Sequence, residues 1–359
     1  MKLHKDISWE EVVRNYASAS EDLGQLHPAI LEQAYKENWF KLFVPKIYGG
    51  AGKQLPEILR LEEQLAAADG SLGWIVTLCT GAAWFAGFLD PALATSVFSD
   101  EKVCFAGSGA VGGTALKTEN GYLINGHWKY ASGALHATIF TANCKVIAKD
   151  GAQSDEGAEV LSFILKKEEV KILEGWAYFG LVATGSHAFE VSNLLVPFNR
   201  SFKINEEIQI YNGGFDYPFL QLAETTLAVN SLGMCTHFLA LVKSVFLRRS
   251  GLKRFNETEL QTFDELLTGS LKEIETLRSA FYTAFDESWN QLIENKNIKE
   301  TNLLEVSAAS RKLVHACWRN VQKLYPYGGL EAASKHSEIN RVFRDVHTAS
   351  QHALLTFEK

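Results

Sequence analysis

The sequence lacks the features that mark secreted, membrane-spanning and nucleic-acid-binding proteins. Its five cysteines form no C-x-x-C pair, so we expect reduced thiols in a cytoplasmic protein rather than a disulfide framework. No apolar run reaches 18 residues, and the first residues turn acidic and amphipathic, which predicts neither a membrane span nor a secretion signal. Lys and Arg total 35 against 42 Asp and Glu, with no basic block, so we expect no binding to nucleic acid.

Proline and glycine are scarce in one long part of the chain, and glycine is abundant in another. No proline and only three glycines lie between Pro218 and Pro326, whereas residues 101–215 hold 14 of the 27 glycines. Helix interiors exclude proline and disfavour glycine, while tight turns between strands need glycine. The 359 residues therefore divide into a helical domain over 1–100, a β domain over 101–215 and a helical domain over 216–359.

The two outer domains show the 3.6-residue period of amphipathic helices. Pro56 suits the first turn of a helix over 56–69, and Ser71 is placed to cap the next helix. Three long amphipathic stretches follow residue 219, and a last helix is predicted from about Ser337 to beyond Ala353. These four stretches predict a four-helix bundle for the C-terminal domain.

A G-x-G-x-x-G pattern at 107–112 follows a short predicted strand and could indicate a dinucleotide-binding loop. That loop works only where a helix N-terminus follows and points at the pyrophosphate. Here hairpin signals follow instead, with Asn120-Gly121 and Asn125-Gly126 each favouring a tight turn. The pattern therefore predicts a plain turn or a glycine-rich loop that shapes the pocket of another cofactor.

Five motifs occur in the order found in the acyl-CoA dehydrogenase superfamily and span nearly the whole chain. They are LFVPKIYGGAG, ADGSLGW, YLINGHWKYASG, GLVATGSHAFEVSNLLVP, and YGG followed by INRVFRDVHTASQHALL. The chain therefore resembles that superfamily. The resemblance implies an N-terminal all-α domain, a central β-barrel domain and a C-terminal four-helix bundle, with a flavin between the last two domains in a homotetramer.

Details of these motifs resemble the flavin-dependent monooxygenase branch, the oxygenase components of two-component systems. The dehydrogenase branch carries a glutamate base near the end of the last helix, and the matching residue here is Ala353. The leading interpretation is a monooxygenase that uses reduced flavin and O2 on a small organic substrate, with a separate flavin reductase as partner. One alternative is an acyl-CoA dehydrogenase with Glu224 as the base, and another is a non-catalytic scaffold that binds flavin or acyl-CoA.

The resemblance also assigns site residues. The Ser132 hydroxyl matches the position beside the flavin N5 edge, and His352 could serve as a general base for a phenol-like substrate. Trp74 and Trp84 are predicted to contact substrate. The predicted flavin contacts are Phe105, Ala106, Ser108, Tyr130, Ala131, Ser132, Arg249, Gly328 and Gly329.

Two further expectations concern ligands. Arg249 matches the arginine through which a neighbouring subunit reaches the flavin pyrophosphate in dehydrogenases, but the Phe-Gly expected after it is missing, so FAD and FMN both remain open. His136 and His187 have no acid or cysteine at ligand spacing in the sequence, so we expect no metal site.

Overall fold

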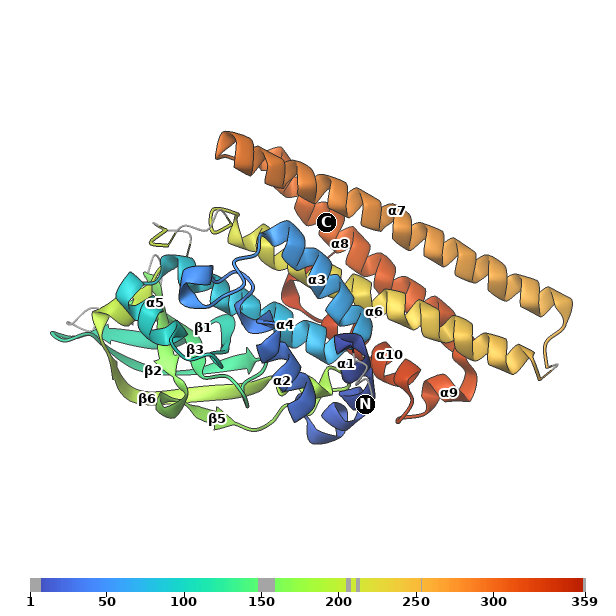
Figure 1. Ribbon diagram of the computed structural model, residues 1–359, viewed down its shortest axis with the longest axis horizontal. Helices are drawn as coiled ribbons and strands as arrows, with labels where there is room; N and C mark the ends of the chain where they lie inside the picture. The colour runs from blue at the N-terminus through green and yellow to red at the C-terminus, as the bar shows by residue number, and fades with distance from the viewer. Residues whose placement is uncertain (1–7, 148–158, 205–207, 211–213, 253, 358–359) are drawn as a thin grey trace, which may run out of the picture.

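A computed structural model of the chain describes residues 8–147, 159–204, 208–210, 214–252 and 254–357. Helices from both ends of the chain pack together, and a sheet built from the middle of the chain lies beside them (Figure 1). The helix, sheet, helix order predicted from glycine and proline usage is therefore present.

The N-terminal helices begin at well-defined caps. The predicted helix over 56–69 is confirmed as α3, and the next helix is capped by Asp69, whose Oδ1 accepts the Leu72 N–H at 2.9 Å, rather than by Ser71. Asp69 takes this role because its extended backbone precedes the first helical residue, whereas Ser71 already lies inside the helix. The helices are α1 Trp9–Leu23, α2 Pro28–Lys36, α3 Leu55–Ala68, α4 Gly70–Ala83 and α5 Pro91–Phe98.

The described strands form one seven-stranded sheet in the order β5-β6-β2-β1-β3-β4-β7, with β5 and β7 at its edges. Pairing among the described residues therefore does not close the barrel that the family resemblance implies. Asn120-Gly121 makes the predicted turn between β1 and β2, but Asn125-Gly126 lies inside β2, where Gly126 faces Gly113. The strands are β1 Phe105–Lys117, β2 Tyr122–Ala131, β3 Ile139–Ile147, β4 Val160–Lys166, β5 Lys171–Leu173, β6 His187–Val196 and β7 Ser201–Phe202.

The glycine-rich segment is part of a strand and not a phosphate loop. Residues 107–112 all lie in β1, and a Cβ added at Gly112 would meet the Trp128 ring at 2.7 Å. The fully buried Trp128 also stacks on Phe189 with ring centroids 5.1 Å apart. Glycine is needed here because the strand passes directly over an indole ring.

The C-terminal part consists of three long helices and two short ones. Unlike the prediction, the last helix ends at Ala349, so Ala353 falls in the separate turn η8 Ala353–Leu355. The helix does not continue because His352 is extended and its Nδ1 caps that turn by accepting the Leu354 N–H at 3.3 Å. The helices are α6 Phe219–Ser250, α7 Glu257–Asn295, α8 Glu300–Leu324, α9 Gly329–Ala333 and α10 Glu338–Ala349.

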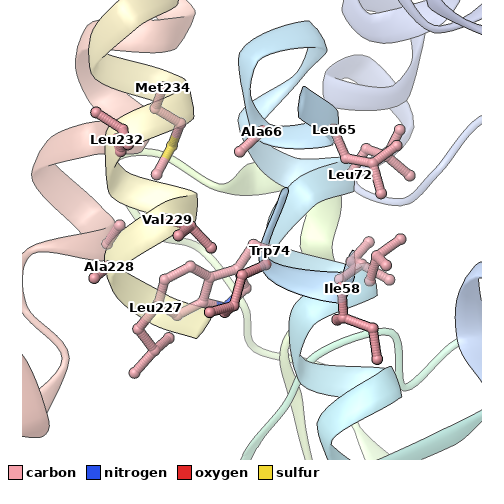
Figure 2. Close-up of a cluster of buried hydrophobic side chains, with 14 of the residues drawn as sticks. Ile58, Leu65, Ala66, Leu72, Trp74, Leu227, Ala228, Val229, Leu232 and Met234 are labelled. Atoms are coloured by element: carbon pink, nitrogen blue, oxygen red, sulfur yellow. The ribbon is translucent and has the colours of Figure 1, made fainter. Parts of the chain in front are cut away.

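Helix α4 lies in the main core and packs against both α3 and α6, which also pack directly on each other (Figure 2). The contacts are close: a Cβ added at Gly73 would lie 2.6 Å from the Ala66 Cα of α3. Two helical segments, Gly70–Phe88 and Phe219–Ser250, are long and apolar enough to cross a membrane, but 89 % and 78 % of their most apolar windows are buried inside the protein. Their composition thus follows from their place in the core.

Polar side chains of α10 connect this helix to α4 and to the loop between β5 and β6. The Asp345 Oδ1 accepts the Leu181 N–H at 2.5 Å, and the Thr348 Oγ1 accepts the Gly180 N–H at 2.8 Å. Arg341 lies 3.6 Å from the α4 cap Asp69. The loop is therefore held by side chains of α10 and not only by apolar packing.

The buried Asp345 carboxyl group predicts that the stability of the protein depends on pH. Burial, reinforced by the nearby Asp69 carboxylate, raises the pKa of Asp345 to about 8. The folded protein keeps a proton that the unfolded chain, with a carboxyl pKa of about 4, releases. The contribution of Asp345 to the free energy of unfolding is therefore complete below about pH 4 and is lost as the pH rises towards 8. We expect Asp345→Asn, which keeps the acceptor for Leu181, to reduce the fall in Tm between pH 5 and pH 8 by a few degrees. Equal falls in both proteins would contradict the assignment.

Candidate functional site

The predicted catalytic serine lies where β2 ends against the start of β6. Ser132 is buried, and its Oγ lies 2.9 Å from the Ser186 Oγ, which in turn lies 2.7 Å from the Thr184 Oγ1. The Gly133 N–H donates to the Thr184 carbonyl at 2.8 Å, which fixes the chain on this side. Because hydroxyls can both donate and accept, this row can present Ser132 to a ligand as a hydrogen-bond donor.

Next to Ser132, three aromatic side chains form a partly exposed surface, here named the aromatic triad: Tyr130, Trp176 and Tyr178. The Tyr130 and Tyr178 hydroxyls are 2.6 Å apart, and the Trp176 and Tyr178 ring centroids are 4.3 Å apart. The exposed fraction is 47 % for Tyr130 and 45 % for Tyr178, which is unusual for aromatic rings that make these contacts with each other. Sequence reasoning found Tyr130 but missed the other two, which a Gly-Trp-Ala-Tyr-Phe-Gly run of aromatics could have indicated.

The predicted flavin contacts on β1 differ in accessibility. Phe105 and Ala106 are buried, and Phe105 stacks on Phe98 with centroids 5.4 Å apart. Ser108 donates its hydroxyl to the Lys129 carbonyl and so ties β1 to β2 directly before Tyr130. Ala131 is also fully buried. The contact of these residues with a flavin stays a prediction.

His352 lies against Trp74 of α4, with ring centroids 6.0 Å apart in an edge-to-face arrangement. Burial lowers the pKa of His352, so its imidazole is neutral at neutral pH. Since Nδ1 accepts the Leu354 N–H, the ring proton of the neutral form belongs on Nε2. The structure thus joins the predicted catalytic histidine to one of the two predicted substrate contacts.

The other tryptophan has a different environment. Trp84, in η3 Trp84–Phe88, is fully buried, donates its indole N–H to the Gly214 carbonyl at 3.2 Å and stacks on Phe219. It is part of the aromatic core near the start of α6. Its contact with substrate stays a prediction.

Glu224, the base required by the dehydrogenase alternative, is fully buried in α6 and forms an ion pair with Arg311 of α8. One carboxylate oxygen is held by that guanidinium, and the other, Oε2, is buried without a hydrogen bond. Removal of Glu224 or Arg311 would leave the other charge buried without compensation. Glu224 therefore has a structural role as the counterion of Arg311.

Arg249, Gly328 and Gly329 come together at the end of the bundle that lies away from the sheet (Figure 1). Arg249 donates to the Tyr327 carbonyl at 2.8 Å, and a Cβ added at Gly329 would lie 2.6 Å from the Arg249 Cζ. Arg249 is 19 residues beyond Asn230, which contacts Thr77 of α4. That separation is about 28 Å of helix, so this group and Ser132 cannot touch the same part of one ligand.

The expectation of no metal site rested on sequence spacing alone, and the fold brings together three possible ligands that are distant in the sequence. One ligand atom each of Cys79, Cys104 and His136 lies within 4.8 Å of the others. The three residues are distant in sequence but meet where α4, the residue before β1 and the loop after Ser132 converge.

The residues around Ser132 fit a flavin. The aromatic triad offers exposed faces for a planar ring, and Ser132 offers a donor to a ring nitrogen. The chemistry of Ser132 and the aromatic triad, which the fold brings together, makes this place suitable for a flavin.

Comparisons with known proteins agree with this reading. The family model for the acyl-CoA dehydrogenase C-terminal domain matches residues 225–357. An indole-3-acetate monooxygenase of Acinetobacter baumannii is 24 % identical over 346 residues, covering 96 % of this chain and 88 % of that protein. HsaA of Mycobacterium tuberculosis, the oxygenase subunit of a flavin-dependent monooxygenase, is 26 % identical over 361 residues, covering 95 % and 88 %.

A solved structure extends the likeness to the whole fold. XiaF from Streptomyces sp., in complex with FADH2 and glycerol, superimposes with a TM-score of 0.83 at 20 % identity, covering 97 % of this chain and 89 % of that one. The C-terminal part of the chain is thus similar to the acyl-CoA dehydrogenase C-terminal domain, and nearly the whole chain is similar to flavin-dependent monooxygenases.

Proposed function

We propose that the chain is the oxygenase component of a two-component monooxygenase that inserts one oxygen atom from O2 into a small aromatic substrate. The observation that carries this proposal is the His352–Trp74 pair directly before Ala353, the residue that matches the carboxylate base of a dehydrogenase. The names of the relatives, which include an indole-3-acetate monooxygenase and a p-hydroxyphenylacetate 3-hydroxylase, support an aromatic substrate.

The residues around Ser132 would hold the flavin. The aromatic triad would cover a ring face, and Ser132, backed by Ser186 and Thr184, would donate its hydroxyl to the ring edge. Reduced flavin bound there supplies the electrons for O2 activation. The term oxygenase subunit in the names of relatives supports a separate reductase that delivers this reduced flavin.

The tautomer of His352 indicates what this residue does. Its Nδ1 is engaged by the Leu354 N–H, so Nε2 carries a proton and can donate a hydrogen bond to an oxygen atom in the site. A general base would instead need a free lone pair at Nε2. We therefore revise the expected base role to that of a donor that orients an oxygen of the substrate.

Trp74 would select for aromatic substrates. Its ring is largely buried and already makes an edge-to-face contact with the imidazole, a geometry that aromatic rings prefer. A flat substrate that approaches His352 would therefore meet an indole surface on α4.

The dehydrogenase alternative has weaker support. Ala353 offers no base, and the Glu224 carboxylate is committed to Arg311 in a fully buried pair. A carboxylate that balances a buried cation cannot take up a substrate proton without leaving that cation unpaired.

We also propose that the protein is a cytoplasmic homotetramer. Arg249 lies 19 residues, or about 28 Å of helix, beyond Asn230, which contacts Thr77 of α4, so Arg249 would meet the phosphate of a flavin bound in a neighbouring copy. Exposed apolar side chains on the long helices support such association: Leu220, Leu247, Leu260, Leu271 and Ile293. FAD has two phosphate groups that could meet Arg249, and FMN has one. Both flavins therefore remain compatible with the site.

Replacing His352 tests the donor role. We expect His352→Ala to lower product formation by roughly 100-fold or more, because one hydrogen-bond donor to a reacting oxygen is lost. Reduced-flavin affinity should be unchanged, since His352 contacts Trp74 and not the Ser132 side. His352→Gln keeps a side-chain N–H and should recover a substantial part of the activity.

The Ala and Gln variants also distinguish whether His352 acts as a hydrogen-bond donor or as a general base. If His352 is a base, Gln and Ala should be equally inactive, and wild-type activity should fall below the lowered pKa of His352 as the ring is protonated. Turnover of His352→Ala equal to wild type would remove His352 from the mechanism. Each outcome is read from product yield per flavin consumed.

Tyr178 tests the flavin site. We expect Tyr178→Leu to weaken reduced-flavin binding about 10-fold or less, because one aromatic face of the triad is lost. Tyr178→Phe keeps the ring and removes only the hydroxyl contact with Tyr130, so it should bind nearly as the wild type does. Equilibrium dialysis under anaerobic conditions measures both, and equal affinity of Tyr178→Leu and wild type would place the flavin elsewhere.

A further inference from the structure

A group of metal-ligating side chains lies directly behind the candidate flavin site. Cys79 of α4, Cys104 before β1 and His136 after Ser132 place their ligand atoms within 4.8 Å of one another. Both thiols are fully buried, and the His136 Nε2 is a buried atom with no hydrogen bond. An orphaned imidazole nitrogen aimed at two thiols leaves an unused lone pair in the interior, which costs free energy unless a ligand takes it.

The space around these atoms suits tetrahedral coordination. The Ser132 carbonyl oxygen lies 3.6 Å from the Cys79 Sγ and is placed to supply a fourth ligand. Gly133, at φ +75°, lines the same space, because a Cβ there would lie 3.0 Å from both the Cys79 Sγ and the His136 Nε2. Neighbouring ligands around a tetrahedral zinc ion are separated by about 3.5–3.8 Å, so small shifts would complete the site.

The thiol chemistry also favours a cation. Two thiolates with Zn²⁺ are neutral as a unit, whereas Cu⁺ would leave a net negative charge in this apolar environment. The Phe40 ring covers His136 with centroids 5.4 Å apart, so a neutral unit is the one that this position tolerates.

We propose that Cys79, Cys104 and His136 bind one Zn²⁺ ion, with the Ser132 carbonyl completing the coordination. The ion would join α4 to the start of β1 and to the loop that follows Ser132, three segments that all border the candidate flavin site. Its role would be structural, because the ion would join three segments that are distant in the sequence. This proposal does not depend on the reaction proposed above.

Cobalt substitution tests the site. Reduced, metal-free, full-length protein titrated with Co²⁺ should develop thiolate-to-metal charge-transfer absorbance that saturates at about one equivalent and is displaced by Zn²⁺. Cys79→Ser and His136→Gln should each lose most of this absorbance. Cys235→Ser is the matched control, because Cys235 also lies beside a buried thiol, Cys317, but is not part of the zinc group.

A second measurement covers the case in which a variant folds poorly. Zn²⁺ should raise the Tm of wild type and Cys235→Ser by several degrees and leave that of His136→Gln unchanged. Absence of Co²⁺ absorbance in the wild type, or equal absorbance in Cys79→Ser, would overturn the proposal. A Cys79–Cys104 disulfide in the purified protein, identified by peptide mass mapping, would do the same.

Discussion

The burial of α4 in the core, against α3 and α6, positions several parts of the candidate site. The Asp69 cap at its start lies beside Arg341 of α10, Trp74 one turn later contacts His352, and the Cys79 thiol reaches the Ser132 carbonyl. These contacts come from three separate stretches of chain. Close packing, as at Gly73 against Ala66, leaves α4 little freedom, so these stretches are held at fixed positions around it.

Two carboxyl groups where α4 meets α10 have opposite electrostatic roles. Asp69 keeps a cation nearby, while Asp345 holds a proton at neutral pH because it is buried beside that same carboxylate. The backbone of Leu181 depends on Asp345, and the hydroxyls of Thr184 and Ser186 follow in the same loop. The donor row behind Ser132 is thus stabilised by a carboxyl group from the C-terminal helix, which explains why the two halves of the chain must pack before the site exists.

Local signals in the sequence predicted much of the fold. Pro56 marked α3, the change in glycine usage separated sheet from helices, and Asn120-Gly121 marked the first hairpin. Asn125-Gly126 misled because the glycine is needed for Trp128 packing, a long-range contact. The position of His352 outside the helix was missed because an imidazole that caps its own following turn does not change the 3.6-residue pattern of apolar residues. The group of Cys79, Cys104 and His136 was missed because the sequence spacing of these residues carries no metal signature.

The most direct test of the proposed function is stopped-flow absorbance of the protein with reduced FMN or FAD, mixed anaerobically and then with O2. Our account predicts a transient spectrum that differs from both reduced and oxidised flavin and that outlasts the oxidation of free flavin. Direct return to oxidised flavin at the rate of free flavin, together with bleaching of bound oxidised flavin by an acyl-CoA, would contradict it and favour dehydrogenase chemistry.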